Sequence, residues 1–381
     1  MSQLNALEAF RTRFQGEPEL LVYAPGRVNL IGEHTDYNEG FVFPAAIDRA
    51  LWIAARRTHG DTRCFSREMY DAEGFDANAV TPGDVSGWGI YPAGVAWALR
   101  EKGHGPLPNL EVALVSEIPP GSGVSSSAAT SVAFAAAWNA FGELGLDSTA
   151  LAQVAQHGEN GFVGVNCGIM DQMAVAHGRA GHAMFLDTRS LEIAYAALPD
   201  GVAMVLCDTG TPRRLTHSAY NERRSQCEAA AVAMGVRALR DATLPMLDAI
   251  REQLDAVVYH RAAYVIREND RAVAFRAALE KGDRAELGYL MAASHAGLRD
   301  DYQVSSPELD AMASLHAPGL IGIRMTGAGF GGACIALAEE SYLEPFMAAM
   351  AAGYQERTGR TGAFIACRAS DGVTVTDIRA S

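Results

Sequence analysis

Four side chains able to bind a ligand or transfer a proton lie close together near the N-terminus. The glycine-containing segment 25–40 carries all four within ten consecutive positions, in an otherwise apolar neighbourhood: Arg27, Glu33, His34 and Asp36. Carboxylates and an imidazole can hydrogen-bond the hydroxyls of a polyhydroxylated ligand. They are equally possible metal ligands. The density of titratable groups argues against the third interpretation, which is a solvated loop with incidental charges.

A glycine- and serine-rich turn, residues 118–127, leads directly into an alanine-rich run. The first N–H groups of a helix lack intrahelical partners and lie at the positive end of its dipole. Small residues let an anion approach this backbone, so the turn predicts a phosphate site that needs no lysine. The alternative is that one serine simply caps the helix, but the three consecutive serines at 125–127 exceed what a cap requires.

Residues 327–332 match the dinucleotide-binding pattern G-x-G-x-x-G literally. That pattern should follow a strand and open a helix within a βαβ unit, whereas here a strand-like run follows the glycines. Fewer than 50 residues remain after the loop, too few for a dinucleotide domain. We therefore predict a tight hairpin whose backbone approaches a ligand or another loop.

One carboxylate stands alone between these segments. Asp171 is the only acidic residue between Glu159 and Asp187, and its surroundings are apolar and rich in glycine. Because burial of a bare charge is costly, this carboxylate is either functional or strongly hydrogen-bonded. Two competing catalytic signatures, HExxH and GxSxG, are absent from the sequence.

Hydrophobic periodicity predicts the elements that must position these residues. The helices are predicted over 3–14, 90–101, 127–143, 149–160, 215–234, 246–255, 258–281, 283–295 and 340–356. Strands are predicted within 41–54, over 110–115, 202–208, 319–325 and 333–337, and last near 362–367, while loops and strand signals dominate 161–190. Because strands and helices mix without a regular βαβ rhythm, the fold class is α+β in two halves that meet near 190–210.

Composition excludes several classes of function. The net charge is −14, and only two of the 31 basic residues are lysines, Lys102 and Lys281. Without a basic run, the chain is a poor candidate for nucleic-acid or anionic-membrane binding. Neither lysine follows a glycine, so the phosphate-binding loop that ends in lysine is excluded. Any bound phosphate must therefore be held by backbone N–H groups, arginine or a metal ion. The six cysteines have no CxxC spacing, and no apolar stretch reaches membrane length. Free thiols and a cytoplasmic location are expected.

Together these segments resemble the GHMP small-molecule kinases and, within them, the galactokinase family. Residues 26–38 resemble the galactokinase signature nearly letter for letter. Residues 119–129 resemble the second, ATP-binding motif of the superfamily, and residues 324–332 resemble the third. Further matches at 167–172, 218–224 and 298–305 extend the resemblance in order from residue 23 to residue 337.

The resemblance implies the two-domain GHMP kinase fold, of class α+β, with the active site in the cleft between the domains. A mixed-sheet domain is expected over residues 1–200, and a ferredoxin-like α/β-plait domain over 201–381. The implied reaction transfers the γ-phosphoryl of ATP to the C1 hydroxyl of α-D-galactose, the first committed step of galactose catabolism. The implied partners are galactose and ATP with Mg²⁺, but no nucleic acid or membrane, and the chain is expected to be a monomer or a homodimer.

The resemblance also implies individual roles by position in the motifs. Arg27 and Asp171 correspond to the catalytic residues. The implied sugar-binding residues are Glu33, His34, Asp36, Gly168 and Tyr220. The implied nucleotide-binding residues are Trp88, Gly121, Ser122, Gly123, Val124, Ser125, Ser126 and Ser127, with Ser127 and Glu159 as magnesium ligands. Whether Asp171 acts as a general base or orients the hydroxyl stays open at this point.

Two other functions are considered. One is a kinase of the same architecture for another sugar, such as N-acetylgalactosamine or arabinose, since residues 206–217 match the family only loosely. The other is a sensor that binds sugar and ATP without turnover. The presence of Arg27 and Asp171 argues against the sensor.

Overall fold

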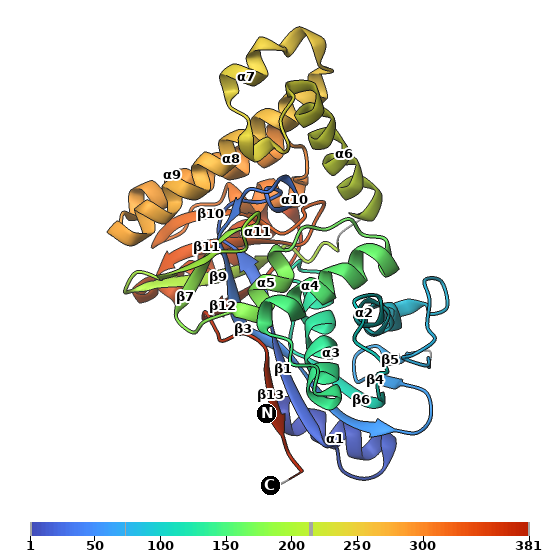
Figure 1. The fold of residues 1–381 in the computed structure, drawn as a ribbon. Coiled ribbons are helices and arrows are strands. Elements are labelled where there is room, and N and C mark those ends of the chain that lie inside the picture. The colour runs from blue at the N-terminus through green and yellow to red at the C-terminus, as the bar shows by residue number, and fades with distance from the viewer. Residues whose placement is uncertain (1, 73, 213–215, 380–381) are drawn as a thin grey trace.

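The computed structural model describes residues 2–72, 74–212 and 216–379. In Figure 1 the two ends of the chain lie near each other at one pole of the molecule, and the long helices of the second half lie at the other. Three β-sheets form among the described residues, with six, four and three strands. Helices cover these sheets and connect them.

The six-stranded sheet is mixed and belongs mainly to the first half of the chain. Its order is β13-β1-β3-β6-β4-β5, and β4 runs parallel to β6 whereas the other pairs are antiparallel. The strands are β1 (Leu20–Asn29), β3 (Pro44–Thr58), β4 (Arg63–Ser66), β5 (Tyr70–Asp71), β6 (Asn109–Ser116) and β13 (Thr374–Asp377). The strand predicted near 362–367 is confirmed, but it is not the last one, because β13 follows it and was not predicted.

Each face of this sheet packs on a different group of helices because strand side chains alternate between faces. Leu21 and Ala54 pack with Phe10 of helix α1 (Ser2–Phe14), whereas Val22 and Ile53 belong to the main core on the opposite face. That core is covered by α2 (Ile90–Glu101), α3 (Ser126–Gly142), α4 (Ser148–Gly158) and α5 (Met170–His177). A small sheet of β2 (Phe41–Val42), β7 (His182–Asp187) and β8 (Ile193–Ala197) lies beside it.

Helix α3 occupies the centre of this helical layer. Every residue from 128 to 138 is buried, and most of them are alanine or another small residue. A helix that is apolar on all sides is one that is surrounded by protein, and alanine gives it high helix propensity without bulk. The N-terminus of α3 is thereby fixed against the end of the neighbouring strand β1, where the site forms.

The four-stranded antiparallel sheet has the order β10-β11-β9-β12. Its strands are β9 (Val202–Asp208), β10 (Leu320–Thr326), β11 (Ala333–Glu339) and β12 (Ala363–Cys367). The helices of this half are α6 (Thr216–Met234), α7 (Leu244–Ala249), α8 (Ala256–Lys281), α9 (Arg284–Asp300), α10 (Pro307–Ala313) and α11 (Leu343–Thr358). A hairpin joins β10 to β11, the second and third strands of this sheet in chain order. Helices connect β9 to β10 and β11 to β12, and this arrangement gives the ferredoxin-like strand order. The predicted α+β class with a mixed sheet and a ferredoxin-like sheet is confirmed.

Most predicted elements are confirmed within a few residues, but the stretch 161–190 is not only loops and strand signals. It contains helix α5, which carries Asp171 in its first turn. The predicted hairpin around residues 327–332 is confirmed, because β10 pairs with β11 in antiparallel register. All six cysteines are free, as expected. The division of the chain at residue 200 stays a prediction.

Candidate functional site

Arg27 of strand β1 contacts the glycine–serine loop just beyond an irregularity in the pairing of β1 with β3. The register of β1 with β3 shifts between Pro25 and Gly26. A Cβ on Gly26 would lie 2.8 Å from the carbonyl oxygen of Val124, so glycine lets the strand approach the loop. The Arg27 backbone N–H then donates to that carbonyl at 3.1 Å, and its Nη1 donates to the Gly123 carbonyl at 2.6 Å. The first two sequence segments therefore meet at Arg27.

Arg27 forms a two-pronged ion pair with Asp171. Its Nε donates to Oδ1 at 2.8 Å, and its Nη2 donates to Oδ2 at 2.7 Å. The arginine side chain is 3% exposed, and the aspartate side chain is 29% exposed and faces the cavity. Parallel N–H donors of this kind fix a carboxylate in both distance and orientation. Asp171, the only acidic residue between Glu159 and Asp187, is thus strongly hydrogen-bonded and also accessible from the cavity.

The glycine–serine loop ends in a strained residue at the start of α3. Ser125, the N-cap position, has a left-handed backbone at φ 61°, which costs energy in a residue other than glycine. Within the described residues its side chain makes no capping hydrogen bond, and its hydroxyl donates instead to Asp171. The interpretation of this serine as a simple cap is therefore wrong. The first N–H groups of a helix have no intrahelical partner, and Ser126 and Ser127, at the start of α3, line the cavity.

A buried carboxylate lies on the same side of the cavity. Glu159, 6% exposed, accepts a hydrogen bond from Gln172 Nε2 at 2.9 Å. Burial raises the pKa of Glu159 to about 7, and the nearby charge of Asp171 adds to the rise. No group of three or more acidic, histidine or cysteine side chains among the described residues is arranged to hold a metal ion.

Asp36 lies on the opposite side of the cavity in residues 32–40, which we call the sugar loop after the role that the sequence resemblance implies for it. Its Oδ1 accepts from the Tyr37 backbone at 3.0 Å, and its Oδ2 accepts from the Met170 backbone at 3.4 Å. A Cβ on Gly168 would lie 2.0 Å from Asp36 Oδ2, so only glycine leaves room for this carboxylate. Burial raises the pKa of Asp36 to about 7, with a further rise from the charge of Asp171.

Glu33 is held by Arg324, the first residue of the matched motif at residues 324–332. Arg324 of β10, which is fully buried, donates from Nη2 to Glu33 Oε2 at 2.9 Å and from Nη1 to the Asn29 carbonyl at 3.0 Å. Tyr264 of α8 donates to the Glu33 carbonyl at 3.0 Å. Burial raises the pKa of Glu33, and the charges of Arg324 and Arg27 oppose that rise. The ion pair joins the sugar loop to the second half of the chain.

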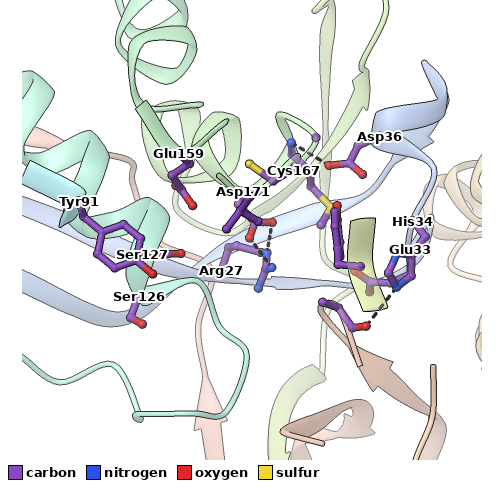
Figure 2. A pocket seen from close by; sticks show the side chains of 15 residues that line it. Arg27, Glu33, His34, Asp36, Tyr91, Ser126, Ser127, Glu159, Cys167 and Asp171 are labelled. Atoms are coloured by element: carbon purple, nitrogen blue, oxygen red, sulfur yellow. Dashed lines mark hydrogen bonds and ion pairs between the residues drawn. The ribbon is translucent and has the colours of Figure 1, made fainter. Parts of the chain in front are cut away.

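These side chains line one cavity of about 280 Å³. Figure 2 shows the Arg27–Asp171 pair in the middle, with Ser126, Ser127, Tyr91 and Glu159 on one side and Glu33, His34 and Asp36 on the other. The predicted residues that line it are Arg27, Glu33, His34, Asp36, Ser126, Ser127, Glu159, Gly168, Asp171 and Tyr220. Residues 213–215, part of the loosely matching segment 206–217, lie outside the described residues.

Several predicted nucleotide-binding residues lie outside the lining of this cavity. Trp88 lies in a short turn just before α2, and Gly121, Ser122, Gly123, Val124 and Ser125 form the loop before α3. Sequence reasoning gave no role to five lining residues, Tyr91, Val165, Cys167, Met170 and Ala328. Cys167, Met170 and Ala328 fall within matched motifs, so their position was a usable signal. Tyr91 offered none, because it reads as an ordinary residue of helix α2.

Fold and motifs together define the class of protein. A model of the GHMP kinase N-terminal domain matches residues 91–179, and a model of the GHMP kinase C-terminal domain matches residues 275–356. The mevalonate kinase of Methanococcus jannaschii, 16% identical, shares the fold with a TM-score of 0.63 over 93% of this chain and 99% of that one. The chain is therefore a GHMP kinase.

More specific similarities narrow this class. A model of the galactokinase galactose-binding signature matches residues 8–57. A galactokinase of Roseiflexus sp. strain RS-1 is 46% identical over 374 residues, which cover 96% of this chain and 95% of the relative. The crystal structure of Lactococcus lactis galactokinase complexed with galactose is 32% identical, with a TM-score of 0.92 over 97% of this chain and 99% of that one. The chain belongs to the galactokinase family and is a sugar kinase. Among its described helices, none has the length and apolarity needed to cross a membrane.

Proposed function

We propose that this chain transfers the γ-phosphoryl of MgATP to the C1 hydroxyl of α-D-galactose, giving galactose 1-phosphate and ADP. The observation that carries the proposal is the position of the Arg27–Asp171 ion pair between two chemically different sides of one cavity. One side offers a helix N-terminus and hydroxyls, which suit phosphate. The other offers carboxylates, which accept hydrogen bonds from sugar hydroxyls.

Galactose binds on the side of the sugar loop. Glu33 and Asp36 accept hydrogen bonds from sugar hydroxyls, while His34, Gly168 and Tyr220 complete the wall. Glu33 is already held in place by Arg324, and Asp36 by two backbone N–H groups. Because protein groups hold both carboxylates, little ordering of these side chains should be needed on sugar binding.

The polyphosphate of ATP binds at the loop before α3. Ser126 and Ser127 line the cavity at the start of α3, where a helix N-terminus offers backbone N–H groups to phosphate. Trp88, Gly121, Ser122, Gly123 and Val124 complete the proposed nucleotide site, and the Ser125 hydroxyl connects it to Asp171.

Ser127 and Glu159 form the proposed magnesium site. Both residues line the cavity, and their hydroxyl and carboxylate oxygens are ligands of the kind that Mg²⁺ prefers. Two protein ligands suffice, because Mg²⁺ in kinases is usually completed by phosphate oxygens and water. When bound, the ion neutralises negative charge on the phosphates.

Asp171 and Arg27 act on the reacting atoms. Asp171 accepts a hydrogen bond from the C1 hydroxyl, orients its oxygen toward the γ-phosphorus and takes up its proton as the new O–P bond forms. Arg27 holds both oxygens of that carboxylate and supplies positive charge beside the transferring phosphoryl group. The bond to the β-phosphate oxygen breaks, and ADP leaves.

An ADP-release assay with MgATP and a panel of sugars tests the proposal. Galactose should give the highest kcat/KM, above N-acetylgalactosamine and arabinose. A much higher kcat/KM on another sugar would favour the alternative kinase, and sugar binding without turnover would favour the sensor. The cytoplasmic location, the absence of nucleic-acid or membrane partners, and the monomeric or dimeric state stay predictions.

A further inference from the structure

A chain of buried polar side chains runs from the sugar loop into the core of the second half. Tyr37 Oη lies 2.8 Å from His34 Nδ1 and 2.6 Å from Tyr302 Oη, which lies 3.2 Å from Cys227 Sγ. At the other end, His34 Nε2 lies 3.2 Å from the carbonyl oxygen of Ala328. Tyr302 and Cys227 are fully buried. The contacts join the sugar loop, helix α6, the segment after α9 and the β10–β11 loop.

The partners determine the direction of these hydrogen bonds. The Ala328 carbonyl can only accept, so the proton of a neutral His34 ring is on Nε2 and Nδ1 is an acceptor. Tyr37 must then donate to His34, Tyr302 to Tyr37, and Cys227 to Tyr302. Burial raises the pKa of the Cys227 thiol to about 11 and raises that of both phenols well above their usual value. All three groups therefore keep the protons that they donate.

We propose that three positioning residues, Tyr37, Tyr302 and Cys227, fix the tautomer and orientation of His34. They thereby hold in place the part of the cavity wall on the side of the sugar loop, which we call the sugar wall. The His34 ring lies 5.6 Å from the Tyr220 ring and 4.9 Å from the Tyr302 ring, measured between centroids. His34, Tyr220 and Ala328 all line the cavity. A ring that turned away from Ala328 would move one part of this wall relative to another.

The polar chain involves the sugar side of the cavity and not the loop before α3. Two of its residues, His34 and Tyr37, belong to the sugar loop. In the same loop, Asn38 Nδ2 donates to the His34 carbonyl at 3.0 Å. Loss of one link should therefore raise the KM for galactose with little effect on the KM for MgATP. This kinetic expectation rests on the proposed function, whereas the tautomer of His34 does not.

The kinetic test compares variants at two links. Tyr302→Phe removes one donor and should raise the galactose KM about fivefold to tenfold, the effect of one lost neutral hydrogen bond, with the MgATP KM within about twofold of the parent. Cys227→Ala should shift the galactose KM in the same direction, and Cys227→Ser, which restores a donor, should reverse the shift. Cys334→Ala, which removes a thiol buried elsewhere in the same core, is the matched control. An unchanged galactose KM in Tyr302→Phe, or a parallel rise of both KM values, would overturn the proposal.

A spectroscopic test needs no turnover and no folded variant of the core. The parent chain is labelled with ¹⁵N-histidine, and the His34 signals are assigned by comparison with His34→Asn. Long-range ¹H–¹⁵N correlation near pH 8 should show a protonated Nε2 and an unprotonated Nδ1. A protonated Nδ1, or averaged nitrogen shifts typical of both tautomers, would overturn the proposal whichever sugar the enzyme phosphorylates.

Discussion

The guanidinium group of Arg27 holds both carboxylate oxygens of Asp171, at 2.8 and 2.7 Å, although the two residues are 144 positions apart in the sequence. Arg27 lies near the end of β1, just after the register of β1 with β3 shifts between Pro25 and Gly26, and Asp171 is in the first turn of the short helix α5. Neither element alone defines a site. The pair exists because the Arg27 backbone is hydrogen-bonded to the glycine–serine loop and α5 packs on the same strand.

Asp171→Asn removes the proton acceptor at the centre of this pair. Asparagine keeps the size of the side chain and can still accept one hydrogen bond, so the fold and galactose binding should persist. We expect kcat to fall by about 10²–10⁴, the usual contribution of a positioned acid–base group. Steady-state kinetics and calorimetric galactose titration measure the two quantities separately. Near-normal kcat would remove Asp171 from catalysis.

Gly168→Ala places a methyl group where the Asp36 carboxylate lies. The Cβ would stand 2.0 Å from Oδ2 and 2.1 Å from Cγ, so Asp36 must move. Because misplacement by about 1 Å can cost up to about a hundredfold in activity, we expect the galactose KM to rise by about tenfold or more and the MgATP KM to stay unchanged. Gly60→Ala is the control, since its Cβ would meet nothing closer than 4.0 Å. Equal galactose KM values in the two variants would contradict the role of Gly168.

Asp36 should make the stability of the sugar-free chain depend on pH. Its carboxyl pKa is about 7 in the folded chain and 3.8 ordinarily, so the folded state holds the proton more tightly between these values. The stability from this group is full below pH 3.8 and is lost as the pH rises to about 7. Asp36→Asn cannot ionise, so its Tm should rise relative to the parent between about pH 5 and pH 8. Parallel curves of Tm against pH would exclude this ionisation.

Glu159→Gln should raise the Mg²⁺ concentration needed for half-maximal activity. The change keeps the shape of the side chain but removes the charge that the ion would meet. Glu101→Gln, an exposed change on α2, serves as the control for a general effect of charge. The measurement is a Mg²⁺ titration at saturating galactose and fixed ATP. Overlapping titrations of Glu159→Gln and the parent would count against Glu159 as a ligand.

Periodicity predicted the long elements well because their apolar faces are wide and regular. Helix α2 and strand β9 have the predicted limits, and both are buried over most of their length. Helix α5 was missed because it has only eight residues and follows a glycine-rich stretch. Strand β13 was missed because it lies at the sheet edge with all four residues exposed, so it carries no buried-face pattern.

Motifs predicted most residues around the cavity but not the contacts that hold them. The glycine–serine segment predicted a helix start, yet the donation from Ser125 to Asp171 depends on tertiary structure. Arg324 lies in a matched motif, but its pairing with Glu33 spans 291 positions. Local spacing cannot reveal such a partner. Tyr91 was missed for the same reason, because only the packing of α2 brings it to the cavity.

The central claim is that this chain phosphorylates galactose at C1, and one competition measurement tests it most directly. Equal concentrations of galactose, N-acetylgalactosamine and arabinose are incubated with the enzyme and limiting MgATP, and the products are analysed by ¹H–³¹P correlation. We predict that one sugar phosphate dominates and that its phosphorus couples to the anomeric hydrogen of galactose. Dominance of another sugar phosphate, or coupling to a hydrogen at another carbon of galactose, would contradict the account.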